Sequence, residues 1–138
     1  MIPIMINDTP VDCINNSAIT YHVSAIAILS VMKKENSRNG QAVRNKNGTY
    51  DLGVMQINEI WLPKIAPYGY TREDLQFNAC KNVAVGAWLI SRSLAEGGAA
   101  SAWTSIANYH SRTQVHNKPY SKSIYANYQK LANITASS

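Results

Sequence analysis

The sequence lacks several features that would place it in other classes of protein. Its only two cysteines, Cys13 and Cys80, form no CxxC or Cys/His motif, so we expect neither a metal site nor a cofactor. No run approaches the roughly 20 apolar residues that a membrane-spanning helix needs. Lysine and arginine are scattered and no Arg-rich recognition helix occurs, so nucleic acid is not an expected partner. The 138 residues hold no internal repeat or low-complexity linker, which predicts one domain.

One carboxyl group stands out at the end of an apolar helical run. The run covers residues 24–32, Glu35 closes it, and a polar stretch containing glycine follows. A carboxyl group at such a junction can be half buried, and half-burial favours the protonated form of a carboxyl group. A protonated carboxylic acid beside a groove is what general acid catalysis of glycosidic bond cleavage requires. The alternative is a solvated glutamate at a helix end.

A short β-ribbon is predicted about twenty residues further on. Asn47-Gly48 is a strong signal for a two-residue hairpin turn. Gly53 allows the backbone to approach a neighbour or a ligand closely. Apolar and amide side chains then alternate over residues 55–58, so one side can pack while the other offers amides to sugar hydroxyl and N-acetyl groups. The alternative is a polar hairpin whose amides only satisfy turn backbone.

Helix starts are marked by capping residues along the chain. Thr9-Pro10 starts a helix to about Tyr21, and Ser24 starts the helix that ends at Glu35. Asn58 starts a short helix, and Thr71 to Asp74 have the outline of a capping box. Asn78 starts the longest apolar-periodic helix, which Gly97-Gly98 stops. Gly86 inside that last helix predicts close contact with a neighbouring helix. Further helices are expected over about 101–109 and from Ser121, separated by a loop over 111–120. The fold class is therefore α+β and mainly α.

Four sequence blocks, in this order, carry a resemblance to a known family. They are VMKKEN at 31–36, GVMQIN at 53–58, NVAVGAW at 82–88 and IANYHS at 106–111. Over roughly residues 13 to 130 the chain resembles the lysozyme-like lytic transglycosylases of the SLT type. It is most similar to the small, single-domain ones that accompany bacterial type III and type IV secretion, conjugation and pilus systems. The resemblance implies a lysozyme-like fold with a small β-ribbon beside the active-site cleft, a core of about 9–132 and a polar C-terminal tail.

The resemblance also implies an activity and a set of site residues. The activity is cleavage of the β-1,4 bond between N-acetylmuramic acid and N-acetylglucosamine in peptidoglycan, with a 1,6-anhydro end on the product and Glu35 as the single acid and base. Supporting or substrate-binding roles fall on Asn36, Asp51, Met55, Gln56, Asn58, Tyr109 and His110. Asn36 and His110 depart from the serine and asparagine that many members carry there, and His110 is not expected to act as a base.

Asp51 keeps a second mechanism open. The segment 48–58 also looks like the corresponding part of animal lysozymes, in which an aspartate at this place is the second catalytic carboxylate. Asp51 would then be a nucleophile or a charge stabiliser in a hydrolytic muramidase, or else a strand-end residue that anchors the ribbon. A third alternative is a catalytically silent wall-binding or assembly module. The tryptophans Trp61, Trp88 and Trp103 are expected in the core rather than as platforms for sugars.

The compartment follows from the same resemblance. Export to an oxidising periplasm favours a Cys13–Cys80 disulfide over two buried thiols. Residues 1–6 are too short and lack the positive region of a signal peptide, so we expect a mature, exported chain that is monomeric. The formal net charge of +5, from 13 basic and 8 acidic residues, is compatible with attraction to the carboxylates of a bacterial wall. Components of a secretion, conjugation or pilus machine are possible partners.

Overall fold

A computed structural model describes residues 3–96 of the chain. Its elements, in order, are β1 (Met5–Ile6), β2 (Thr9–Pro10), α1 (Val11–Tyr21), α2 (Ala25–Glu35), β3 (Ala42–Arg44), β4 (Tyr50–Leu52), β5 (Ile57–Asn58), the 3-10 helix η1 (Glu59–Trp61), α3 (Leu62–Ile65), the 3-10 helix η2 (Ala66–Tyr68), α4 (Arg72–Phe77) and α5 (Ala79–Glu96). This arrangement of helices and two small antiparallel sheets confirms the predicted α+β class. The helices expected beyond residue 96, and their glycine stop signal, lie outside the described residues.

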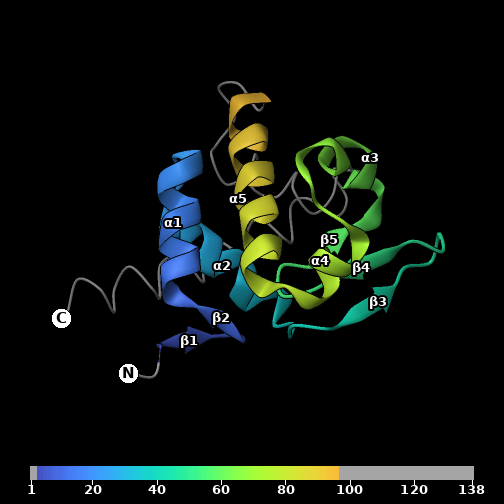
Figure 1. Ribbon diagram of the computed structural model, residues 1–138, viewed down its shortest axis with the longest axis horizontal. Helices are drawn as coiled ribbons and strands as arrows, with labels where there is room; N and C mark the ends of the chain where they lie inside the picture. The colour runs from blue at the N-terminus through green and yellow to red at the C-terminus, as the bar shows by residue number, and fades with distance from the viewer. Residues whose placement is uncertain (1–2, 97–138) are drawn as a thin grey trace.

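Helix α5 is the centre of the described fold. Figure 1 shows it upright, with α1 beside it, α3 on its other flank and α2 behind. Its buried apolar side chains are Ala79, Val83, Val85, Ala87, Leu89 and Ile90, which lie on more than one face of the helix. Helix α2 contacts both α1 and α5, and its buried side chains include Ala27, Ile28, Val31 and Met32. Burial of these apolar side chains fixes α2, and therefore its C-terminal end, against the rest of the molecule.

Four of the five helix starts predicted within residues 3–96 are confirmed by side-chain hydrogen bonds, and one of the four is Asn58 at the start of η1. Ser24 accepts a hydrogen bond from the backbone N–H of Ile26 at the start of α2. Thr71 and Asp74 form a reciprocal capping box at the start of α4, even though aspartate replaces the usual glutamate. Asn78 accepts from the N–H of Lys81 at the start of α5. Each cap satisfies a backbone donor that the helix itself leaves without a partner.

The prediction that Thr9 caps α1 is wrong. Thr9 and Pro10 form strand β2, paired antiparallel with β1, and α1 starts at Val11 with no side-chain cap. The Thr9 hydroxyl is fully buried and donates instead to the carbonyl of Asn7, 3.1 Å away. A tight turn at Asn7 and Asp8, both at positive φ, brings the Asn7 carbonyl within reach of that hydroxyl, which therefore bonds inside the turn instead of capping the helix.

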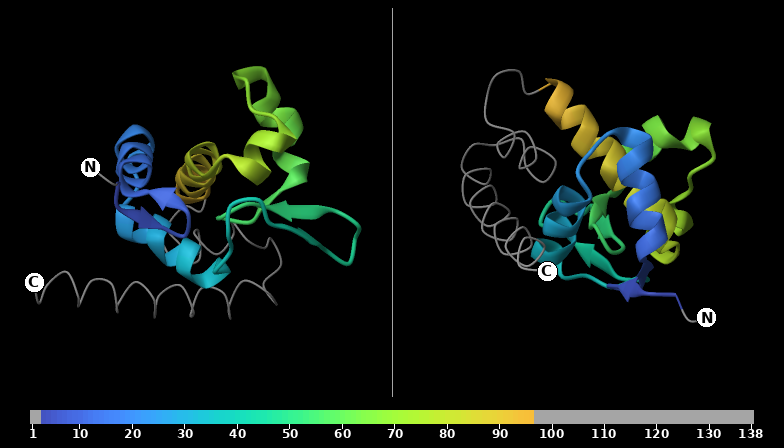
Figure 2. Two further views of the ribbon diagram at one scale, coloured as in Figure 1. Left: turned by 60° about the horizontal axis from the view of Figure 1, so that its bottom comes forward. Right: turned by 90° about the vertical axis from the view of Figure 1, so that its left-hand side faces the viewer.

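The ribbon is present, but its turn differs from the predicted one. Strand β4 pairs antiparallel with both β3 and β5. The turn runs from Asn45 to Thr49, with the Gly48 N–H donating to the Asn45 carbonyl over 3.0 Å. Gly48 alone among the turn residues has a positive φ, of 88°, whereas the predicted two-residue turn needs one at Asn47 as well. The ribbon projects away from the helices in Figures 1 and 2.

A disulfide between Cys13 and Cys80 joins α1 to α5, as expected from the resemblance. Their Cα atoms lie 5.4 Å apart and the two residues are 67 positions apart in the sequence. The bond sits in the first turns of both helices, so it fixes the ends at which the two helices begin. Within residues 3–96, no helix is long and apolar enough to cross a membrane.

Loss of this disulfide is expected to lower the free energy of unfolding by about 4 kcal/mol, because the bond restricts a long loop in the unfolded chain. Urea unfolding of the oxidised protein and of the Cys13→Ala/Cys80→Ala double variant measures the difference. A reductant should lower the stability of the wild type and leave the double variant unchanged. Equal midpoints for the two proteins without reductant would contradict the prediction.

Candidate active site

Glu35 lies where α2 ends and the chain turns away. It is the last residue of the helix and is half-buried. Asn36 follows in the left-handed conformation, with φ of 46°, and its N–H donates to the Met32 carbonyl over 2.8 Å. Because α2 is held by its buried apolar face, the carboxyl group of Glu35 is presented from a rigid support. The predicted position of Glu35 at the helix end is confirmed, and the side chain of Asn36 is exposed beside it.

A hydrogen-bond network links this helix end to the segment after the ribbon. The Nε2 of Gln56 donates to the Ser37 Oγ over 3.0 Å, and the Ser37 hydroxyl donates to the Gln41 Oε1 over 2.8 Å. Ser37 is only 1% exposed, so these bonds are shielded from water. Ser37 is two residues from Glu35, and the network therefore brings Gln56 to the C-terminal end of α2. Sequence reasoning did not single out Ser37, and nothing in its local pattern marks it.

The alternation predicted over residues 55–58 is confirmed. Met55 and Ile57 are buried, whereas Gln56 and Asn58 are partly exposed. Gln56 has a φ of 53° and its N–H donates to the Gly53 carbonyl over 3.1 Å. The side-chain Nε2 of Gln56 also donates to that carbonyl, over 3.0 Å. Part of the amide capacity of Gln56 is thus used to hold a tight turn and to position Ser37.

Met55 packs against α5 at Gly86, and this contact accounts for the glycine inside the helix. A Cβ added at Gly86 would lie 2.3 Å from the Met55 Sδ, so a larger residue here would force the end of this side chain to move. The expected partner of Gly86, a neighbouring helix, is therefore wrong, and the partner is the turn that follows β4. Met55 itself is fully buried, which places its side chain in the core under the site.

Asn82 is the residue that ties this turn to the helices, and sequence reasoning did not assign it a role. It is fully buried; its Oδ1 accepts from the Met55 N–H over 2.9 Å, and its Nδ2 donates to the carbonyls of Leu52 and Leu75 over 2.8 Å each. All these partners are backbone groups of other elements. The available signal was a polar side chain on an otherwise apolar face of α5, because a buried amide must find partners.

Asp51 and Asn58 form a polar pair across the ribbon. They lie opposite each other in the pairing of β4 with β5, and the Asn58 Nδ2 donates to the Asp51 Oδ1 over 3.0 Å. The same Nδ2 donates to the Thr49 Oγ1, while the Asn58 Oδ1 accepts from the Ile60 N–H. Asn58 thus anchors the ribbon and caps η1, as predicted for the helix start. Asp51 is half-buried and engaged by this amide.

An ion pair braces the chain that leaves Glu35. The Asp8 carboxylate accepts from the Arg38 Nε over 2.7 Å and from the Asn39 N–H over 3.2 Å. The hydrogen bond from Arg38, aided by the weaker effects of the Asn39 N–H and of the Arg38 charge, holds the pKa of Asp8 below its usual value against the opposing effect of desolvation. Asn7 adds a hydrogen bond to the Met32 carbonyl at the end of α2. Sequence reasoning missed this brace because its members are some 30 residues apart.

Tyr109 and His110, the site residues predicted from the fourth sequence block, lie outside the described residues, as does Trp103. Among residues 3–96, no three His, Cys, Asp or Glu side chains gather as the ligands of a metal ion would. The described part of the site therefore consists of the Glu35 carboxyl group at a helix end, the Asp51 carboxyl group on the ribbon, and the amides of Gln56 and Asn58 that hold the neighbouring segments.

Comparison with known proteins places the chain in a family. Residues 12–131 match the family model described as "Transglycosylase SLT domain". The match covers most of the chain, and the protein belongs to this family. The SLT domain has a lysozyme-like α+β fold, so the predicted family and fold class are both confirmed.

Individual relatives are more distant. The chain is 28% identical over 126 residues to Protein IpgF of Shigella flexneri, covering 88% of this chain and 82% of that protein. It is 26% identical over 136 residues to Invasion protein IagB of Salmonella typhimurium strain SL1344, covering 95% and 84%. It is also 27% identical to a peptidoglycan-binding-like protein of Escherichia coli O157:H7, covering 79% and 68%.

Proposed function

We propose that this protein is a peptidoglycan lytic transglycosylase with Glu35 as its catalytic acid and base. The observation that carries the proposal is the position of Glu35, a half-buried residue at the end of a packed helix. Ser37, two residues further on, accepts a hydrogen bond from Gln56, which lies in the sequence block 53–58 that resembles the SLT family. Family membership supports a transglycosylase-like activity. The exposed amide of Asn36, next to Glu35, is proposed to contact substrate, as are Tyr109 and His110.

The proposed reaction uses one carboxyl group twice. Protonated Glu35 donates its proton to the glycosidic oxygen as the bond from C1 of N-acetylmuramic acid to that oxygen breaks, and the N-acetylglucosamine portion leaves with a free hydroxyl. The carboxylate of Glu35 then accepts the proton of the muramoyl 6-hydroxyl as its oxygen bonds to C1. The proton count on Glu35 is restored, no water enters, and the product ends in a 1,6-anhydro ring.

The proposed setting is the periplasm of a bacterium, where local opening of the wall would serve a secretion, conjugation or pilus apparatus. The names of two relatives, an invasion protein and a peptidoglycan-binding-like protein, support this setting. The Cys13–Cys80 disulfide is compatible with an oxidising compartment. Gln56, Asn58 and Met55 are proposed to act mainly by holding the two walls of the site in place.

Digestion of purified sacculi by the wild type, followed by mass spectrometry of the fragments, tests the proposed reaction. Anhydro ends are expected, because the 6-hydroxyl replaces water as the attacking group. Reducing ends would instead show a hydrolytic muramidase, and an absence of new ends would show a binding module without activity.

Asp51→Asn is expected to retain activity within about tenfold of the wild type, because no second carboxylate needs to bond to C1 in the proposed reaction. The amide keeps an oxygen that can accept from Asn58, so the ribbon should stay in place. Rates of fragment release from sacculi measure the effect, and urea unfolding checks the fold. Asn58→Ala is the matched comparison, since it removes the ribbon bonds and leaves the Asp51 charge. A loss of several orders of magnitude in a folded Asp51→Asn protein, together with reducing ends, would contradict the proposal.

A further inference from the structure

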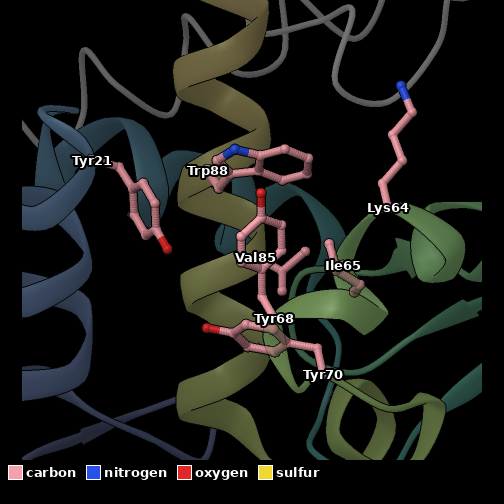
Figure 3. A pocket seen from close by; sticks show the side chains of 7 residues that line it. All are labelled: Tyr21, Lys64, Ile65, Tyr68, Tyr70, Val85 and Trp88. Atoms are coloured by element: carbon pink, nitrogen blue, oxygen red, sulfur yellow. The ribbon is translucent and has the colours of Figure 1, made fainter.

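A hollow in the described part of the molecule is rich in aromatic side chains. It has a volume of 410 Å³, and Figure 3 shows the seven side chains that line it: Tyr21, Lys64, Ile65, Tyr68, Tyr70, Val85 and Trp88. We call it the aromatic groove. Its residues come from the end of α1, from α3, η2 and the loop that follows, and from one face of α5. A volume of this size falls within the range of about 300 to 1,000 Å³ that is typical of small-ligand sites.

The aromatic groove and helix α2, which ends at Glu35, lie on opposite sides of α5. Figure 3 shows the lining side chains in front of α5, whereas α2 lies behind α5 in Figure 1. The left view of Figure 2 shows the same order nearly down the axis of α5, with α1 and α3 on one side and α2 on the other. The groove is therefore not a part of the wall that carries Glu35.

Its side chains combine ring faces with hydroxyl groups. Tyr68 is 80% exposed at the rim, an unusual exposure for a large aromatic side chain. Trp61 and Trp88, both expected in the core, are partly exposed, and they meet edge-on with ring centroids 6.2 Å apart. Burial, and next the charge and hydrogen bond of Tyr70, raise the pKa of Tyr21 above its usual value. Ring faces beside hydroxyl groups suit a ligand that has apolar faces and polar edges.

The charge around the groove is positive. Lys64 is among the lining residues, and its Nζ lies 5.7 Å from the centre of the Trp61 ring. The guanidinium of Arg92 lies 5.7 Å from the centre of the Trp88 ring. Lys81 lies over Tyr70 but is paired with Asp74 at 3.2 Å, so it adds less. None of the seven lining residues is acidic, which favours a ligand that carries a carboxylate.

We propose that the aromatic groove is an accessory binding site for the peptidoglycan glycan strand, with Tyr68 and Trp88 covering sugar rings and Lys64 binding a carboxylate of the stem peptide carried by a muramoyl unit. The choice of peptidoglycan as the glycan rests on the proposed function. Rings and hydroxyls match an amino sugar, and the cations distinguish a muramoyl unit from a neutral one. A second contact on the far side of α5 would keep the enzyme on the wall while its products leave the cleft.

Titration of the Glu35→Gln protein with a purified peptidoglycan tetrasaccharide carrying stem peptides tests the proposal, because this variant binds without turnover. Nuclear magnetic resonance should show shifts at the Trp88 indole and at the amides of Lys64 and Tyr68. Adding Tyr68→Ala should weaken binding at these signals tenfold or more and leave shifts near residue 35 unchanged. Both Tyr68 and Lys64 are exposed, so their variants should fold normally.

Chitotetraose, which has the same backbone without stem-peptide carboxylates, is the matched ligand. It should bind the groove at least fivefold more weakly than the peptidoglycan fragment, and Lys64→Gln should remove that preference. Lys46→Gln, at the exposed tip of the ribbon turn, is the charge control and should keep it. No shift at the groove signals, unchanged affinity in Tyr68→Ala, or equal binding of both ligands would overturn the proposal.

The outcome is separable from that of the proposed function, because binding is read in an inactive protein and the reaction is read from products of the wild type. Anhydro products with no groove binding would reject the accessory site alone. Groove binding with no new ends from the wild type would reject the transglycosylase reaction alone.

Discussion

Glu35→Gln is expected to reduce release of anhydro fragments from sacculi by at least about 1,000-fold, because general acid–base catalysis contributes typically 10²- to 10⁴-fold and this one group serves both proton transfers. Glutamine has nearly the same shape and cannot donate an acidic proton or accept one as a carboxylate does. The loss should therefore appear in the rate of turnover, with binding to sacculi retained. Fragment release followed by chromatography and a pelleting assay with sacculi measure the two separately.

Glu73→Gln is the matched control for this change. Glu73 is exposed in the first turn of α4, so its replacement should alter stability by no more than about 1 kcal/mol and leave turnover unchanged. Urea unfolding of both variants shows whether they are as stable as the wild type. If they are, a loss of turnover in Glu35→Gln comes from the missing acid and not from a damaged fold. Release within a few-fold of the wild type in a folded Glu35→Gln protein would show that Glu35 is not the acid.

Local signals predicted the helices of the described fold well. The caps at Ser24, Thr71 and Asn78 form as expected, because each acts on a backbone donor only two or three residues away. The apolar spacing of α5 predicted its burial for the same reason, since a helix repeats every 3.6 residues whatever surrounds it. Glu35 could be placed at the end of α2 because it follows directly on such a run.

The connections that shape the site depend on contacts between distant parts of the chain. Gly86 reads as a site of close approach, yet only the fold shows that its neighbour is Met55, 31 positions earlier. Asn82 joins the backbone of three segments, and Asp8 braces Arg38 from 30 positions away. Local propensity also failed at Thr9, where a hydrogen bond to the Asn7 carbonyl in the preceding turn replaced the expected helix cap.

In the candidate site, the sequence predicted which side chains are exposed but not which groups they bind. The exposure pattern around Gln56 and Asn58 followed from simple alternation in the sequence, and it is confirmed. Their hydrogen bonds did not follow from it: Gln56 supports Ser37, and Asn58 holds Asp51 and caps η1. Alternation determines which face a side chain lies on, whereas its partners depend on where other elements pack.

Gly53→Ala is expected to destabilise the protein by about 3 to 5 kcal/mol, a large part of the stability of an ordinary domain. Gly53 has a φ of 73°, and a Cβ there would lie 2.3 Å from both the Asn82 Nδ2 and the Leu75 carbonyl oxygen. Neither neighbour can move easily, since the carbonyl belongs to the backbone of α4 and the amide is fixed by hydrogen bonds to Leu52 and Leu75. The turn that carries Gln56 should be displaced, so activity should fall as well.

Gly69→Ala separates the steric effect from the backbone effect. Gly69 has a similar φ of 90°, but a Cβ there would have nothing within 4 Å. Alanine at this position should cost only about 1 to 2 kcal/mol, the penalty of a left-handed conformation for a residue with a Cβ. Urea unfolding of the two variants measures the difference, which should be at least 1 kcal/mol and should come with loss of activity in Gly53→Ala alone. Equal destabilisation of the two variants would contradict the prediction. It would mean that the Asn82 side chain and the Leu75 carbonyl can make room for the methyl group at residue 53.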